Sequence, residues 1–556
     1  MQHKKLLLLY TLLIASLQNF AQYSHADTLR GTNGIGRRWW NITKYDIVVE
    51  PNIAEQTISG TVTITFNLPA DYNGQPMQID LQEPMHIDKI RLKGFSEREQ
   101  SDITMQREGN VYWINGLRNL NYIGNQIELQ FSGKPIIAKN APWDGGLIWK
   151  TDENDYAWVS VACQQKGASL WHPCKDIQSD EPDSGASMTI ICPEALQGIG
   201  NGRLVNSKIE KGKRYNTWAV KNPINNYNLV FYIGKYLPIK KTYDGKNGKL
   251  DCTFWAIEGN EKKAEAAYDD IFKMLQAFEK WFGAYPWYTD GYQLVESPHL
   301  GMEHQSAIAY GNKYKKGYLG RDLSGTGWGK KWDYIIVHES GHEWWGNHIS
   351  TNDIADMWVH EGFTTFSEAL FVEEQFGKSA GEDYTIGMRS NIMNNDPMIA
   401  DYGVNKEPPG DIYYKGANLL LMIRTIINND DKFKAMLIQM QKTFGNRTCN
   451  SIEIETFICQ YAGINFMPFF QQYLYTNQIP VLHTTIKSEE SVTLQITNCN
   501  DNFEIIYHVP ISDTEFKTIT LKANQAQKVN IKLKKSRWEQ LQKKGYYLGS
   551  TFFSGD

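Results

Sequence analysis

The run His338-Glu339-Ser340-Gly341-His342 constrains the fold of this 556-residue chain more than any other feature. Two histidines four apart on an α-helix lie on one face, about 40° apart in projection, so both imidazoles can reach one cation. Residues 332–337 lead in as an apolar helical run, which indicates a largely buried helix. Because buried histidines need a polar partner, the pattern predicts a metal-binding helix. The alternative, an ordinary helix with a surface ion pair, fits this apolar setting poorly.

A third ligand is expected from a later segment, at Glu361. Two histidines and one glutamate with an open fourth position form the ligand set of a catalytic zinc ion. Glu339 points into the same site and can act on a metal-bound water. We therefore predict a metallohydrolase whose ligands are His338, His342 and Glu361. Cobalt or manganese could occupy the same ligands in place of zinc.

His348 is a competing candidate for the third ligand. Its spacing matches the histidine triad of the metzincins, in which a glycine turns the chain before the last histidine. That glycine would have to be residue 345, where this chain has Trp345. If the helix continues, His348 points about 80° away from His338 and lies about 9 Å along the axis from His342. Glu361 is therefore preferred.

The composition is that of a globular protein with more than one domain. A chain of this length is expected to form roughly two to four domains. Hydrophobic residues make up 41% and aromatic residues 13%, which is ample for a core. The formal charge of -5 offers no basic surface for nucleic acid, so no nucleic-acid partner is expected. No pattern in the sequence indicates an oligomeric state.

The first residues have the features of a secretory signal. A basic start is followed by an apolar stretch over 6–17 and then by Asn19-Phe20-Ala21 before a plausible cleavage point. The stretch is too short to span a bilayer comfortably. We predict a signal peptide over 1–21, a mature chain that starts near Gln22, a periplasmic or extracellular location, and no stable membrane span.

The seven cysteines leave their pairing open. Export permits disulfides, and Cys163 with Cys174 or Cys449 with Cys459 could close short loops. Burial as free apolar thiols is an equally good interpretation.

Hydrophobic periodicity divides the mature chain into three parts and predicts a multi-domain α+β protein. Residues 22–240 are rich in alternating stretches, such as 61–68 and 127–131, and are predicted to form a β domain. Residues 241–478 are predicted to be mainly helical, with helices over 261–282, 333–348, 361–376, 415–429, 431–444 and 451–475. Alternation returns in 479–556, which we interpret as a small β-sandwich that serves as a packing module.

Several linked motifs give the chain a resemblance to a known family. In sequence order they are Trp171–Asp176, Gly301–His304, His338–Asn347, Trp358–Phe363 and Tyr413–Gly416. In these segments the chain resembles the aminopeptidase N family of zinc metallopeptidases, gluzincins that also include leukotriene hydrolase. The resemblance implies a thermolysin-like catalytic domain, one zinc ion per chain, and peptide substrates with a free N-terminus.

The resemblance also implies roles for the residues of the metal site. His338, His342 and Glu361 would bind the zinc ion. Glu339 would take a proton from the attacking water and later hand it to the leaving amine. Tyr413, two residues before the Lys-Gly pair, would stabilise the oxyanion.

A second set of residues would bind the substrate. In the family, a glutamate reads the free N-terminus, and here it is Glu303, in a segment that also contains Gly301 and Met302. A glutamine that corresponds to Gln164 would assist it. A carboxylate beside the metal fixes the register, so that only the first peptide bond reaches the zinc ion.

Two further acids could orient a zinc histidine. Glu368 corresponds to such an acid in the family, and Asp356 could act in the same way. Solvated charges on a helix are an equally good interpretation of both.

The chain also departs from the family pattern. Leu300 and His304 replace residues of the segment that contacts the substrate, so we expect the subsite to differ in shape from that of the family. We expect a short, bacterial-type member, in which a β tail stands where larger relatives have a long helical C-terminal domain that covers the active site. That change implies an open cleft.

We therefore predict an exported zinc aminopeptidase that removes N-terminal residues from peptides. The first alternative is a zinc peptidase with relaxed or endopeptidase action through the open cleft. The second is a non-catalytic peptide-binding relative, which the intact set of ligands, base and tyrosine argues against.

Overall fold

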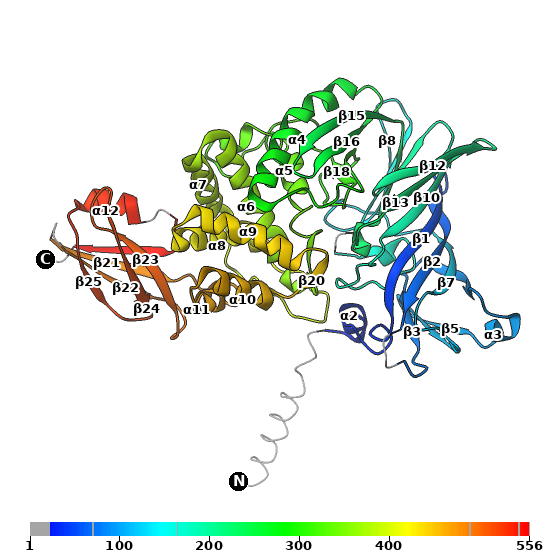
Figure 1. The fold of residues 1–556 in the computed structure, drawn as a ribbon, viewed down its shortest axis with the longest axis horizontal. Coiled ribbons are helices and arrows are strands. Elements are labelled where there is room, and N and C mark those ends of the chain that lie inside the picture. Colours follow the sequence, from blue (N-terminus) through cyan, green and yellow to red (C-terminus); the bar gives the residue numbers. More distant parts are fainter. Residues whose placement is uncertain (1–22, 69–71, 164, 489–490, 543–544, 555–556) are drawn as a thin grey trace, which may run out of the picture.

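The computed structural model describes residues 23–68, 72–163, 165–488, 491–542 and 545–554. They form three parts that follow one another along the long axis, a β-rich N-terminal part, a helical centre and a C-terminal β part (Figure 1). The multi-domain α+β class is as predicted. The predicted signal peptide lies outside the described residues. Within the described ranges, no helix is long and apolar enough to cross a membrane.

The N-terminal part is built from three sheets. The largest has seven strands in the order β12 (Arg203–Glu210), β13 (Lys213–Val220), β10 (Ala186–Pro193), β1 (Asn41–Asn52), β2 (Thr57–Asn67), β7 (Asn125–Gly133), β4 (His86–Leu92). The second has the order β11 (Gln197–Gly200), β14 (Phe231–Gly234), β9 (Ala157–Ala162), β8 (Gly146–Thr151), and the third the order β3 (Met77–Asp80), β6 (Val111–Asn115), β5 (Thr104–Glu108). Two short helices, α2 (His25–Gly31) and α3 (Glu97–Ser101), flank them.

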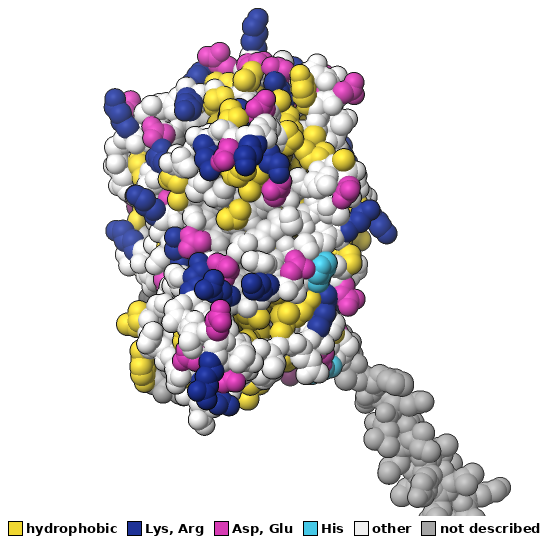
Figure 2. Space-filling model, turned by 90° about the vertical axis from the view of Figure 1, so that its right-hand side faces the viewer, with side chains coloured by type: hydrophobic (Ala, Val, Ile, Leu, Met, Phe, Trp, Pro, Cys, Tyr) yellow, Lys and Arg dark blue, Asp and Glu magenta, His cyan; other side chains and the backbone are white. Residues whose placement is uncertain are grey.

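The strand alternation predicted for this part is confirmed on two neighbouring strands. Val62 on β2 lies opposite Leu129 on β7, and Ile64 lies opposite Ile127. All four side chains are buried. On the face of this part seen in Figure 2, acidic and basic side chains are interspersed.

The central part combines one sheet with a group of helices. The sheet has the order β15 (Tyr236–Gly245), β16 (Gly248–Ile257), β17 (Tyr292–Glu296), β18 (Ile308–Tyr310), and a short pair joins β19 (Ile349–Thr351) to β20 (Arg447–Cys449). The helices are α4 (Glu261–Phe282), α5 (Tyr334–Gly341), α6 (Trp358–Phe376), α7 (Lys378–Gly387), α8 (Asp411–Ile427), α9 (Asp430–Phe444), α10 (Ser451–Ala462) and α11 (Met467–Tyr473). β15 crosses the boundary predicted between residues 240 and 241.

Helix α6 is the centre of this helical group. It packs against α4, α5, α7 and α8, and its residues 358–372 are all buried. A helix that is buried on every side lies inside a core. The polar side chains of α6 therefore face other buried groups. Among them, Glu361 and Glu368 face His338 on α5.

Two predicted helices end earlier than expected. The metal helix was expected to reach residue 348, but α5 ends at Gly341. The chain then turns, with Gly346 at φ 121° and its N–H donating to the Ile349 carbonyl at 2.8 Å. The helix expected over 451–475 is broken because Gly463 adopts the left-handed conformation, at φ 67°, and caps α10.

The C-terminal part has two sheets. One has the order β25 (Gln527–Asn530), β22 (Ser491–Thr497), β21 (Val481–Ser488), β26 (Gly549–Ser554), and the other pairs β23 (Glu504–Pro510) with β24 (Phe516–Lys522). A helix, α12 (Lys535–Gln542), completes this part. All seven cysteines of the chain are free thiols, and five of them are buried.

Candidate metal centre and substrate cavity

Three donor atoms converge where α5 meets α6. The Nε2 atom of His338 lies 3.6 Å, and that of His342 3.3 Å, from the Oε2 atom of Glu361. The ligand atoms of the three residues all lie within 4.8 Å of one another, and the three side chains are buried. The helical spacing of the histidines and the first turn of α6 thus meet at one point, as the sequence predicted.

The other ring nitrogen of each histidine is already engaged. His338 Nδ1 donates to Glu368 Oε1 at 2.6 Å, and Tyr384 donates its hydroxyl to the second oxygen of Glu368 at 2.6 Å. His342 Nδ1 donates to the Trp345 carbonyl at 2.9 Å. These bonds fix the tautomers, so that both Nε2 lone pairs point into the site.

The second predicted orienting acid does not reach the histidines. Asp356 accepts from the Tyr402 hydroxyl at 2.6 Å and from the Ser451 backbone N–H at 3.1 Å. It therefore ties the start of α6 to other segments, and the prediction that Asp356 orients a zinc ligand is wrong. His348 lies outside the site, where its Nδ1 is 2.7 Å from Gln441 Oε1.

The arrangement fits a zinc ion. Glu361 Oε2 is buried and has no hydrogen-bond partner within the described part of the chain, a costly state for a carboxylate oxygen unless a cation faces it. Although burial alone would raise the pKa of Glu361, the imidazoles of His342 and His338 hold that pKa well below its usual range. Two imidazoles and one carboxylate are the donor set that catalytic zinc prefers.

Glu339 lies beside the donor atoms but is not one of these three ligands. A Cβ atom at Gly301 would meet Glu339 Oε1 at 2.1 Å, so only glycine at position 301 leaves room for the carboxylate. Burial raises the pKa of Glu339 to about 7, although the neighbouring imidazoles of His338 and His342 lower it, and the acids Glu303 and Glu361 also raise it. Such a carboxyl group can both accept and donate a proton near neutral pH.

Tyr413 lies at the start of α8 and faces the metal centre. Its ring stacks on His338 with centroids 6.1 Å apart. Burial and the negative charges of Glu361 and Glu303 raise the pKa of Tyr413 well above its usual value, so its hydroxyl keeps its proton. Tyr413 is thus a hydrogen-bond donor aimed at the metal centre.

Glu303 is buried beside the metal centre. Its carboxylate lies within 4.8 Å of donor atoms of Glu339 and His342. Tyr227 donates its hydroxyl to Glu303 Oε1 at 3.2 Å, and Asn347 Nδ2 donates to the Glu303 carbonyl at 2.8 Å. Burial is the main reason why the pKa of Glu303 is raised.

These groups open onto one cavity of about 430 Å³, which we call the substrate cavity. Its volume is in the range of pockets that hold small ligands. Besides the metal site it is lined by Trp143, Leu300, Gly301, Met302, Glu303, Tyr318, Arg321, Tyr334, Glu407, Tyr413 and Tyr414. Of the two departures from the family pattern, Leu300 therefore reaches the cavity. His304 does not line it, because its Nδ1 bonds to the Tyr232 hydroxyl at 2.6 Å in the core.

Comparison with known proteins agrees with this geometry. Residues 266–473 match the model of the peptidase family M1 domain. The central part of this chain is a peptidase family M1 domain. The resemblance predicted from the motifs is thereby confirmed.

Similar proteins include several aminopeptidases. The leucyl aminopeptidase of Saccharolobus solfataricus is 21% identical over 405 residues, which cover 69% of this chain and 49% of that protein. Aminopeptidase N of Lactobacillus helveticus is 24% identical over 436 residues, which cover 73% and 47%. An M1 zinc metallopeptidase from Deinococcus radiodurans shares the fold, with a TM-score of 0.63 at 18% identity over 81% of this chain and 97% of that one. The chain spans about half the length of the curated relatives it matches.

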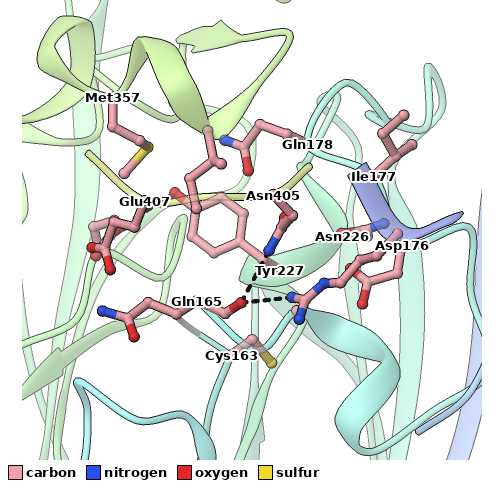
Figure 3. A pocket seen from close by; sticks show the side chains of 14 residues that line it. Cys163, Gln165, Asp176, Ile177, Gln178, Asn226, Tyr227, Met357, Asn405 and Glu407 are labelled. Carbon is pink, nitrogen blue, oxygen red and sulfur yellow. Dashed lines mark hydrogen bonds between the residues drawn. The ribbon is translucent and has the colours of Figure 1, made fainter. Parts of the chain in front are cut away.

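A second, smaller pocket borders Glu303 and is lined by residues of both the N-terminal part and the central part (Figure 3). Gln165, Asn405 and Glu407 line it, together with Tyr227. Asn405 Nδ2 donates to the Gln165 carbonyl at 3.4 Å, and Arg30 on α2 donates to the same oxygen at 2.6 Å. Gln164, which was predicted to assist Glu303, lies outside the described residues, but both of its neighbours line this pocket.

Sequence reasoning missed three residues of the site. Tyr227 comes from the N-terminal part, and Glu407 comes from the loop before α8 and borders both pockets. Arg321 comes from the loop before α5. None of them belongs to a motif at fixed spacing from the metal ligands, so only the folded chain brings them to the M1 active-site region.

Proposed function

We propose that this chain is a zinc-dependent aminopeptidase that holds one zinc ion per chain on His338, His342 and Glu361. The observation that carries the proposal is the buried carboxylate of Glu303 beside the metal ligands. A substrate ammonium paired with Glu303 sets the register and brings the first peptide bond to the metal site. The names of the similar proteins support this choice, and the Deinococcus radiodurans structure is described as bound to a Tyr-Ser-Ala substrate.

The chemistry divides between the metal and the protein side chains. Zinc in such a site supplies a Lewis acid that lowers the pKa of water and polarises a carbonyl group. Glu339 takes the proton of the attacking water and passes it to the leaving amine, which its pKa of about 7 permits. Tyr413 donates a hydrogen bond to the carbonyl oxygen as negative charge develops there, a contribution on the order of a few kcal/mol to the barrier.

The test combines metal analysis with a substrate panel. We expect one zinc per chain, hydrolysis of aminoacyl-arylamides by the wild type, and loss of that hydrolysis in Glu339→Gln with its zinc retained. The panel also ranks the preferred N-terminal residue. Bound zinc without turnover of any arylamide would contradict the aminopeptidase proposal.

A second candidate is endopeptidase or relaxed action, which Leu300 on the cavity wall and the expected open cleft favour. Matched peptides with a free and an acetylated N-terminus separate the two. An aminopeptidase that depends on Glu303 cleaves only the free form. Equal cleavage of both forms would exclude the proposed role of Glu303.

We also propose that the protein is exported to the periplasm or the extracellular space, on the basis of the signal-like residues 1–21. Mass spectrometry of the protein purified from its own cells is expected to find a mature chain that starts near Gln22. An intact Met1 in that protein would contradict export.

A further inference from the structure

The charges that line the substrate cavity are distributed unevenly. Glu303, Glu339, Glu361 and Glu407 all line it, and the first three gather at the metal centre. Among the described residues that line the cavity, Arg321 is the only lysine or arginine. A ligand with a positive and a negative end would therefore find a complementary charge for each end.

A tight turn holds Arg321 at the cavity. The backbone N–H of Tyr318 donates to the Arg321 carbonyl at 2.9 Å, and the N–H of Arg321 donates back at 3.0 Å. The two residues between them, Leu319 and Gly320, have φ angles of 50° and 93°. This is the hydrogen-bond pattern of a two-residue hairpin turn with a positive φ at both central positions, which defines the backbone closely.

A chain of ring contacts relates Arg321 to the metal centre. The guanidinium carbon of Arg321 lies 5.2 Å from the ring centre of Tyr318. The Tyr318 ring meets the Tyr334 ring edge to face at 5.3 Å, and the Tyr334 ring stacks on His338 at 5.1 Å. Tyr318 and Tyr334 also line the cavity. The cation is thus positioned on the same wall as a zinc ligand, three contacts away from it.

The guanidinium group is available to a ligand. Within the described part of the chain, the Arg321 side chain forms no ion pair and no side-chain hydrogen bond, and it is exposed. Its charge still acts on another residue that lines the cavity, Tyr414. Burial raises the pKa of Tyr414 to about 12, and Arg321 acts in the opposite direction on that pKa.

We propose that Arg321 binds the free C-terminal carboxylate of short peptide substrates, whose ammonium end is held at Glu303. The planar guanidinium fork matches a carboxylate in bidentate geometry. This inference rests on the proposed aminopeptidase function and adds a substrate class to it, namely short peptides with both termini free. Because Arg321 is exposed, the effect is expected to be moderate and to weaken as salt is added.

The test compares each peptide acid with its C-terminal amide. For alanine di-, tri- and tetrapeptides, kcat/KM is measured for both forms at low ionic strength, in the wild type and in Arg321→Gln. We expect the wild type to prefer the acid about five- to tenfold at one of these lengths, and Arg321→Gln to bring the acid-to-amide ratio close to one. The ratio is taken within each variant, so a general loss of activity cancels.

Two further variants separate the guanidinium fork from net charge. Arg321→Lys keeps the charge without the fork, and we expect an intermediate ratio. Lys315→Gln removes one positive charge from the same loop, away from the cavity lining, and is expected to keep the wild-type ratio. An equal ratio in the wild type and Arg321→Gln at all three lengths would overturn the inference. A wild type that hydrolyses neither arylamides nor peptides would instead refute the proposed function.

Discussion

Replacement of Glu368 by glutamine tests how the metal centre is held in its working geometry. Glu368 lies on α6, is fully buried, and its carboxylate accepts from Nδ1 of His338 at 2.6 Å. The substitution keeps the size of the side chain and removes its charge. The imidazole then loses an ionic partner that both fixes its tautomer and raises its basicity towards zinc.

The size of the expected loss of zinc affinity follows from the burial of the His338–Glu368 pair. A hydrogen bond to a charged group contributes about 1.5–3 kcal/mol. Tyr334 limits the loss, because its ring stacks on His338 and its hydroxyl lies 3.3 Å from the same Nδ1 atom. We therefore expect zinc affinity to fall about 10- to 100-fold, or roughly 1.4–2.7 kcal/mol.

Competition with a chromophoric chelator measures the zinc affinity. Arylamide hydrolysis in excess zinc measures the catalytic activity that the variant keeps when its zinc site is fully occupied. The matched control is Glu374→Gln on the same helix, where the carboxylate pairs at the surface with Lys280. That variant is expected to bind zinc like the wild type, because surface pairs contribute little. A folded Glu368→Gln variant with unchanged zinc affinity would refute the role assigned to Glu368.

Three further substitutions probe the base, the oxyanion donor and the buried core. Tyr413→Phe is expected to lower kcat about 10²- to 10³-fold with zinc content unchanged, and steady-state kinetics within threefold of the wild type would contradict this. Gly301→Ala would place a Cβ atom 2.1 Å from Glu339 Oε1, so the base must move and kcat/KM should fall on the order of 10²-fold; unaltered kinetics would show that the segment yields freely. Burial lowers the pKa of His172 from 6.5 to about 4, so the unfolded chain binds more protons below pH 6.5, and stability that is present above 6.5 is lost as the pH falls towards 4. When the pH is lowered from about 7 to about 5, the free energy of unfolding measured with urea should therefore fall by about 2 kcal/mol less in His172→Gln than in the wild type. An equal fall in both proteins would refute this.

Local periodicity accounts for the parts of the site that were predicted from the sequence. The spacing of His338 and His342 fixes their common face wherever the helix lies, because it depends only on helical geometry. The alternation of Val62 and Ile64 identified the buried face of β2 in the same way. The breaks at Gly346 and Gly463 were missed, since a glycine adopts a positive φ only when the surrounding contacts favour the turn.

The sequence by itself determined which residues are candidates for the metal ligands and the base, and it determined the order of β and helical parts, because the His-Glu-x-x-His spacing and the hydrophobic periods are local features of the chain. Only the tertiary structure decided between Glu368 and Asp356, since both lie on or next to α6 and only packing against α5 brings one of them to His338. It also turned His304 into the core and Leu300 into the cavity. Tyr227, Glu407 and Arg321 reach the substrate cavity or the second pocket that borders Glu303 from three distant segments. Their positions depend on long-range packing, for which a single sequence carries no periodic signal.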